Sequence, residues 1–296
     1  MGKNETMTFF YWTATVIYGL AAILQIMGFL LKKEKFAGLG MKLVWLGIFA
    51  HTLNISINIS MPVIEQKYAD SFYKVIGSAV WMGMVLFLVS SLVTKAVRPA
   101  GLLILPVSAA LMVLGGVIPC HPLGPSPVFK GWQMWGHVIG GGFNYGFALL
   151  AAAMGLLYLL KEAKGKTGYP YDQLPDLEVL DRLNYRFVLA AFILATIMLH
   201  FAVLWAYMRA QMTFTTVRTG ISIAVLVWGY WMIYAVWLGL RWGFGWRGRR
   251  LAWYSPFALI LVMVFMFYMA PFREKNYHSG PFSPPYTVGA GQIPGK

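Results

Sequence analysis

The sequence predicts an all-α membrane protein, a bundle of about eight transmembrane helices with both termini on the outer (periplasmic) side. Hydrophobic residues make up 59% of the 296 residues and charged residues only 11%, a balance that excludes an ordinary soluble domain. Basic residues also gather in alternate connections. Apolar runs long enough to cross a bilayer, at about 20 residues each, cover 8–31, 41–63, 73–94, 101–119, 134–160, 185–208, 219–240 and 251–271.

The distribution of lysine and arginine sets the expected orientation. One set of connections carries fifteen of the 24 basic residues, and the opposite set, with both termini, carries the other nine. The larger set is Lys32, Lys33, Lys35, Lys42, Lys95, Arg98, Lys161, Lys164, Lys166, Arg182, Arg186, Arg241, Arg247, Arg249 and Arg250. Because basic loops stay in the cytoplasm, the net charge of +14 indicates membrane topology and not a nucleic-acid partner. We expect a multi-pass protein of a bacterial-type cytoplasmic (inner) membrane.

The organisation along the chain is simple. One transmembrane domain is expected over residues 1–271, followed by an extended, Gly- and Pro-rich external tail over 272–296. The N-terminus lacks a basic lead and a small-residue cleavage site, so the first apolar run is expected to be a retained span. In the longest cytoplasmic connection, 161–184, the motif PDLEVLDRLNYR is expected to form a short amphipathic helix at the membrane interface.

The stretch 133–150, QMWGHVIGGGFNYGFALL, is the first candidate for a ligand-binding face. His137 and Asn144 are seven residues apart and therefore share one face of a helix. The glycines at 140–142 leave that face without side-chain bulk, which would suit a flat porphyrin with His137 as an iron ligand. The competing interpretation is close helix packing through small residues, which is common in membranes. On this stretch alone the packing interpretation is favoured.

Histidines inside the apolar runs are further candidates. His51 lies near the middle of the second run, and Asn54 and Asn58 share its face. A polar strip at bilayer depth should face the bundle interior. Neutral imidazole is a common ligand of haem iron, and His200 in the sixth run is a second candidate; the alternative for each is a hydrogen-bonded structural histidine.

Other metal and proton sites are not indicated. The apolar runs contain no Asp or Glu, which argues against a carboxylate proton relay or a di-iron site. The single cysteine, Cys120, excludes an internal disulfide and a cysteine-based metal cage. His121 next to it lacks the CxxCH pattern that attaches haem covalently.

Five segments follow one another in an order that is typical of a known family. They are WLGIFAHTLNI with His51, WGHVIGGGFNYGFALLAAAMGLLYLL with His137, LDRLNYRFVLAAFILATIMLHFAVLWA, YAVWLGLRWGFGWRGRRLAW, and NYHSG with His278. Together they resemble the CcsA/ResC/CcmC-like cytochrome c assembly proteins, from about residue 40 onward and most strongly over 130–280. The resemblance implies a membrane protein that binds b-type haem non-covalently. It also implies that His51 is an intramembrane ligand and that His137 and His278 are external ligands.

The chain departs from the family pattern at two positions. The family has a tryptophan-rich external loop, WGxxWxWDPKExW, where this chain has MRAQMTFTTVRTG without Trp or Asp. Gly239 stands where the family has a second intramembrane histidine, and His200 is the candidate that replaces it as partner of His51. Arg209 and Arg218 flank the altered loop and are candidates to pair with haem propionates; the alternative is anchoring at the interface.

Three functions stay open. The favoured one, because the resemblance covers so much of the chain, is handling or presenting haem at the outer face of the membrane. The second is a b-haem subunit that passes electrons between quinol and an external c-type cytochrome or oxidoreductase, which the altered loop favours. The third is a haem-free scaffold. No nucleophile–base pair or nucleotide loop indicates a catalytic site acting alone. Expected partners are the membrane and an external cytochrome or another complex subunit, with no nucleic acid.

Overall fold

The computed structural model describes residues 3–59, 72–117, 132–163, 169–210 and 217–269, and over these ranges the chain is helical without a strand. The α-helices are α1 (Lys3–Leu30), α2 (Glu34–Ile59), α3 (Phe72–Val93), α4 (Gly101–Val117), α5 (Trp132–Ala163), α6 (Leu177–Ala210), α7 (Val217–Gly243) and α8 (Arg249–Met269). Short 3-10 helices cover Lys95–Ala100 and Tyr171–Gln173. Each of these α-helices overlaps one of the predicted apolar runs.

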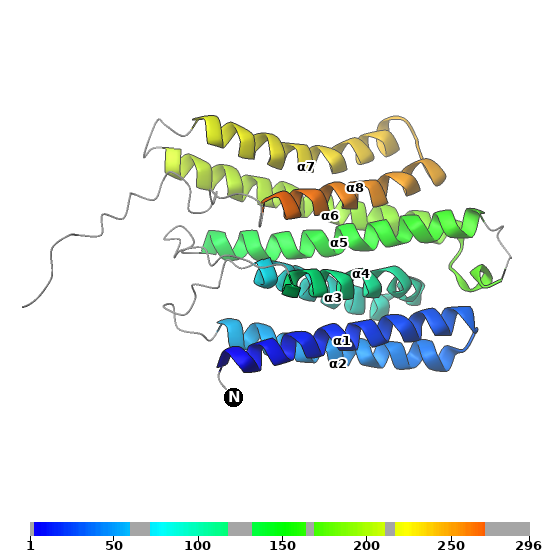
Figure 1. Cartoon of the computed structure of the whole chain (residues 1–296). Helices are drawn as coiled ribbons and strands as arrows, with labels where there is room; N and C mark the ends of the chain where they lie inside the picture. The colour runs from blue at the N-terminus through cyan, green and yellow to red at the C-terminus, as the bar shows by residue number, and fades with distance from the viewer. Residues whose placement is uncertain (1–2, 60–71, 118–131, 164–168, 211–216, 270–296) are drawn as a thin grey trace, which may run out of the picture.

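Successive helices run in opposite directions and pack side by side (Figure 1). The α1–α2 pair forms one side of the bundle, α3 and α4 lie next to it, and α6 and α7 form the far side. α5 lies in the middle and packs against α3, α6 and α8. An up-and-down arrangement of this kind buries one apolar stripe of each helix against its neighbours.

Six of the described helical segments are long and apolar enough to cross a membrane, by length and composition. They are Thr8–Leu30, Glu34–Ile57, Ile76–Val93, Lys95–Val117, Ile139–Ala163 and Leu177–Phe201. Large apolar side chains stay exposed along these helices, for example Phe49 and Leu92, which suits lipid contact and not water. The chain is therefore a multi-pass, all-helical membrane protein.

The expectation of a separate interfacial helix at PDLEVLDRLNYR is wrong. Leu177 begins α6, which continues without a break to Ala210. After Pro175 no proline or glycine interrupts the helix. Leu180, Leu183 and Asn184 are buried in the bundle, so this stretch extends the transmembrane helix instead of lying on the membrane surface.

Ten of the fifteen basic residues predicted to face the cytoplasm lie at one end of the bundle. The connections 31–33, 94–100, 169–176 and 244–248 all lie at this end (Figure 1), and it carries Lys32, Lys33, Lys35, Lys95, Arg98, Lys161, Arg241, Arg247, Arg249 and Arg250. Lys164 and Lys166 lie outside the described residues. The charge asymmetry of the sequence is thus an asymmetry between the two ends of the fold.

Polar contacts hold the connection between α5 and α6 against this end of the bundle. The Lys161 Nζ is buried and donates to the carbonyls of Leu174 at 2.7 Å and Pro175 at 3.1 Å. Gln173 Nε2 donates to the carbonyl of Phe29 at the end of α1, 2.9 Å away. The Phe29 carbonyl lies in the last turn of α1, where carbonyls lack partners within the helix, and the bond to it joins the α5–α6 connection to the α1–α2 pair.

Glycines let α5 approach its neighbours closely. A Cβ on Gly142 would lie 2.1 Å from Sδ of Met82 on α3, and one on Gly140 would lie 3.0 Å from Cγ of Met198 on α6. A Cβ on Gly146 would lie 2.9 Å from the Cα of Gly83. The glycine-rich face of α5 therefore packs on α3 and α6 through small residues, as membrane helices commonly do.

Gly146→Ala is expected to destabilise the bundle by about 1–3 kcal/mol, the usual cost of overpacking. The added methyl group meets backbone atoms of Gly83, which cannot move aside as a side chain does. Thermal unfolding in detergent measures the effect. The control is Gly19→Ala, where no atom lies within 4 Å of the added Cβ and the better helix propensity of alanine should preserve stability. Equal stability of the two variants would contradict the close α3–α5 contact.

Candidate functional site

The candidate site lies around His51 on α2, between α1 and α3. His51 is 0% exposed, and Asn54 one turn further along the helix is buried as well. The expectation that this polar strip faces the bundle interior is thus met at these two positions, and the side chain of Asn58 is not among those that the structure describes. Buried polar groups normally have hydrogen-bond partners, so the surroundings of the two ring nitrogens of His51 decide how this residue is accommodated.

The two ring nitrogens of His51 have different surroundings. Nδ1 lies 3.4 Å from the hydroxyl oxygen of Tyr18 on α1. Nε2 is buried and has no hydrogen-bond partner in the described part of the chain. A Cβ on Gly77 of α3 would lie 3.6 Å from this nitrogen. A buried polar atom left without a partner costs about 1–3 kcal/mol, so Nε2 is an unusual feature at the centre of the bundle.

Tyr18 owes its position to Gly47. A Cβ on Gly47 would lie 2.6 Å from the Tyr18 ring, so only glycine allows the ring to lie against α2 at this point. Gly47 and His51 are four residues apart and therefore lie on one face of α2. The ring crosses α2 at Gly47 and its hydroxyl reaches His51 one turn further on. Tyr18 is fully buried, which keeps water from competing for this contact.

A second tyrosine of α1 completes the surroundings of His51. The Tyr11 ring meets the imidazole edge to face, with 6.5 Å between ring centroids. Its hydroxyl donates to the carbonyl of Met112 on α4 at 2.6 Å. On α3, Trp81 Nε1 donates to the hydroxyl of Thr52, the residue next to His51, at 2.9 Å. The histidine therefore lies between α1 and α3, and Tyr11 joins this part of α1 to α4.

The donor chemistry of His51 fits an axial ligand of haem iron. When Nδ1–H donates to an oxygen, Nε2 keeps its lone pair for a metal, the usual arrangement of ligating histidines. The space beside Nε2 is narrow, because a Cβ on Gly77 of α3 would already lie 3.6 Å from this nitrogen. A metal at Nε2 therefore requires α3 to move away from α2 at Gly77.

The structure does not bring His200 close to His51. α2 packs against α1 and α3, whereas α6 packs against α5, α7 and α8. Figure 1 shows α2 and α6 on opposite sides of the middle helices. His200 is exposed on α6, and its Nδ1 lies 2.8 Å from the carbonyl oxygen of Thr196, to which it donates. Its surroundings are those of an exposed histidine on the helix surface.

Asn144 is buried at the contact between α5 and α6. Its Nδ2 donates to the carbonyl of Ala191, and its Oδ1 has no partner among the described residues. The bond to Ala191 joins two helices across the bundle, which suits the packing interpretation of this stretch.

The predicted external residues lie at the end opposite the basic connections. His137 is in the first turns of α5, Arg209 in the last turn of α6 and Arg218 in the first turn of α7. Figure 1 shows these helix ends at the same end of the bundle. For these three residues the structure describes the backbone and not the side chains. His278 and the tail 272–296 lie outside the described residues.

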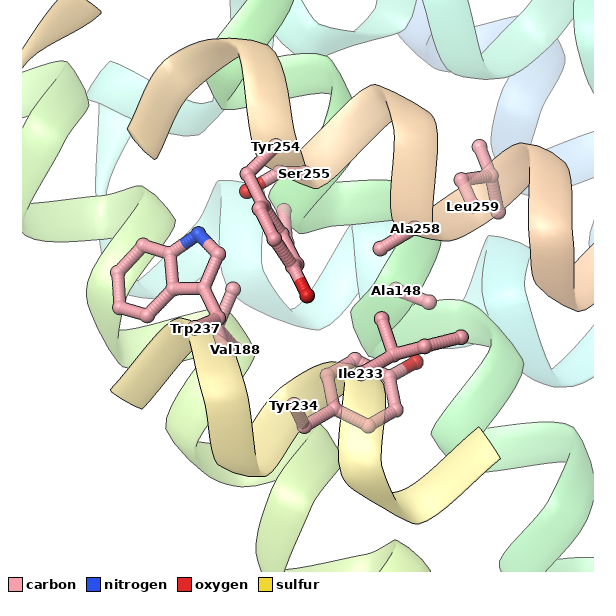
Figure 2. A pocket seen from close by; sticks show the side chains of 10 residues that line it. Ala148, Val188, Ile233, Tyr234, Trp237, Tyr254, Ser255, Ala258 and Leu259 are labelled. Carbon is pink, nitrogen blue, oxygen red and sulfur yellow. The ribbon is translucent and has the colours of Figure 1, made fainter. Parts of the chain in front are cut away.

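A small cavity lies between α5, α6, α7 and α8 (Figure 2). Its open volume is ≈ 10 Å³, about what one water molecule needs. Trp237 and Tyr254 line it, and the Tyr254 side chain points across it toward Tyr234 in Figure 2. This cavity is about the size of one water molecule and is far too small for a porphyrin or a quinol ring.

Of the two predicted ligands whose side chains are described, His51 is buried among other helices and His200 is exposed. Tyr18, which lies next to His51, is a residue that sequence analysis missed. In the described ranges no group of three or more His, Cys, Asp or Glu residues is placed to hold a metal ion. A haem iron needs one or two axial side chains and not such a cluster. No protein-family model, curated protein or solved structure matches this chain.

Proposed function

We propose that this protein handles b-type haem in the membrane, in the manner of the cytochrome c assembly proteins that its sequence resembles, and presents it at the outer face. The observation that carries the proposal is His51, fully buried with an Nε2 that has no partner in the described part of the chain. An ionisable residue at this depth is kept for function and not for stability. Haem supplies the metal that such an imidazole binds.

The proposal includes a topology. All eight helices cross a bacterial-type cytoplasmic membrane, with the basic end in the cytoplasm and both termini outside. Residues 1–271 then form one transmembrane domain, and 272–296 form the external tail. His137 and His278 are the proposed external ligands, and Arg209 and Arg218 pair with the haem propionates.

Tyr18 has the role of a positioning residue for His51. Tyr18→Phe keeps the ring over Gly47 and removes the hydroxyl near Nδ1. Loss of such an outer partner typically weakens metal binding by 10- to 100-fold, so we expect haem retention to fall by about tenfold or more. Haem per protein after detergent purification measures this.

The control for this substitution is Tyr11→Phe. Tyr11 lies on the same helix and touches the same imidazole ring, and its hydroxyl donates to Met112 and not to His51. We expect haem retention of this variant to stay close to that of the wild type. A ¹⁵N spectrum of His51 in the haem-free protein gives a second readout, since Tyr18→Phe should shift the Nδ1 resonance. Equal retention in both variants would contradict the role of Tyr18.

A second function, electron transfer between quinol and an external c-type cytochrome or oxidoreductase, is favoured by the loop sequence around 208–220, which lacks Trp and Asp. Two tests separate the functions. A strain without this protein should lack mature c-type cytochromes if it handles haem for assembly. Rapid reduction of its haem by a quinol, with normal cytochrome maturation in the deletion strain, would instead assign it to electron transfer. If the protein never contains haem, the haem-free scaffold is the function that remains.

A further inference from the structure

The turn between α7 and α8 concentrates positive charge at one end of the bundle (Figure 1). Residues 241–250 read RWGFGWRGRR, with four arginines and no acidic residue. The charge of Arg241 is already compensated within the protein, because Arg241 forms an ion pair with Asp181. Arg247, Arg249 and Arg250 are exposed, so three guanidinium groups are displayed within four residues.

Among the described residues, little compensates this charge. The Arg249 Nε lies 3.6 Å from Oε2 of Glu162, but the Arg249 side chain is 71% exposed. Exposed ion pairs of this kind contribute little. Arg250 stacks over the ring of Trp246 at 5.4 Å, which orients the guanidinium without neutralising it. The turn therefore presents a strong positive potential to its surroundings.

Large aromatic side chains flank the arginines. Trp242, Phe244 and Trp253 are 61%, 77% and 59% exposed. Exposed tryptophans and phenylalanines next to arginines are typical of the headgroup layer, where the ring enters the acyl region and the cation meets phosphate.

The turn is also held in a fixed shape. The backbone N–H of Gly248, at a φ of +64°, donates to Oδ1 of Asp181 at 2.9 Å. The N–H of Trp246 donates to the carbonyl of Leu240 at 3.1 Å. A surface that is ordered before it binds loses less conformational entropy on binding.

We propose that the α7–α8 turn is a binding surface for the phosphate groups of anionic phospholipids. Arg247, Arg249 and Arg250 supply the charge, because guanidinium groups pair with phosphate oxygens in a bidentate manner. Trp242 and Trp253 supply apolar contacts to the lipid. The proposal does not depend on haem binding.

The test is lipid retention by the purified full-length protein. The protein is incubated in detergent with phosphatidylglycerol or with phosphatidylcholine, and bound lipids are counted by native mass spectrometry. Basic residues near a membrane surface contribute about 1 kcal/mol each, which is about fivefold in affinity. The triple variant Arg247→Gln, Arg249→Gln and Arg250→Gln should bind phosphatidylglycerol about 100-fold more weakly, and phosphatidylcholine as before. The single variant Arg247→Gln, at an exposed position, should show about a fivefold loss.

The control variant carries Lys33→Gln, Lys35→Gln and Lys95→Gln, which removes three exposed charges from the same end of the bundle. It should bind phosphatidylglycerol within about threefold of the wild type. This change is smaller than the contribution of about fivefold that one basic residue makes. A loss as large as that of the arginine variant would overturn the proposal, because any positive charge at this end would then suffice. Equal retention of the two lipids by the wild type would overturn it as well.

Discussion

Replacing His51 by alanine is expected to remove most of the haem from the purified protein. Loss of an outer-shell partner already weakens metal binding by 10- to 100-fold, so removal of the ligand itself should cost at least about 100-fold in affinity. The physical reason is that Nε2 is a buried imidazole nitrogen without a partner among the described residues, so its lone pair is free to bind iron. The ratio of haem to protein, from the pyridine haemochrome assay, measures the effect.

Two further variants make this result specific to the ligand. His200→Ala removes an exposed imidazole that donates to Thr196 on its own helix, and we expect it to keep its haem. His51→Gly opens a space the size of an imidazole, and imidazole added during reconstitution should restore haem binding if the ring is the ligand. Normal haem content in His51→Ala would exclude this site.

Asp181→Asn is expected to give the largest loss of stability. Asp181 receives two hydrogen bonds from Arg241, at 3.2 and 2.8 Å, and one from the backbone of Gly248 at 2.9 Å. The side chains of Arg241 and Asp181 are only 13% and 17% exposed. Neutralising one partner of a buried pair leaves the other charge uncompensated and costs about 3–5 kcal/mol.

The apparent melting temperature in detergent measures this loss. Arg241 also stacks over the ring of Tyr185 at 4.6 Å, so the α6–α7 contact should loosen together with the ion pair. The control is Asp172→Asn, which breaks an ion pair with Lys32 whose side chains are both 39% exposed. This control should change the melting temperature little. Equal effects of the two substitutions would contradict the structural role of Asp181.

The helices were predictable from the sequence because their signal is local. An apolar run of about 20 residues gives a helix in a membrane whatever its neighbours are. The ends of the helices were harder to predict from the sequence. α2 begins at Glu34, seven residues before the predicted run, and α6 begins at Leu177, because charged residues continue a helix beyond the apolar part. Polarity marked the end of the predicted span but not the end of the helix.

The surroundings of His51 were only half predictable. Depth and the i+3 position of Asn54 predicted a buried face, and the structure buries both residues. The contact with Tyr18 could not be predicted, because it depends on which helix packs beside α2. Gly47, one turn before His51, was a usable signal, since a glycine at that position marks a place where another side chain approaches the helix.

The partnership of His51 with His200 rested on the missing family histidine at Gly239 and on the position of His200 inside an apolar run. Two residues at a similar depth can still lie on opposite sides of a bundle, and the sequence contains no information on the order of the helices around it. α3, α4 and α5 lie between α2 and α6 (Figure 1). The resemblance to cytochrome c assembly proteins stays a hypothesis, and its external ligands His137 and His278 stay predictions.

The visible spectrum of the purified wild-type protein tests the central claim, haem bound at His51, most directly. The protein is produced with haem supplied and is measured as isolated and after dithionite. We expect a Soret band and, on reduction, the sharp α and β bands of a b-type haem, and both should be absent from His51→Ala. A wild-type protein that is folded, monodisperse and free of haem would contradict the claim and leave His51 as a structural histidine.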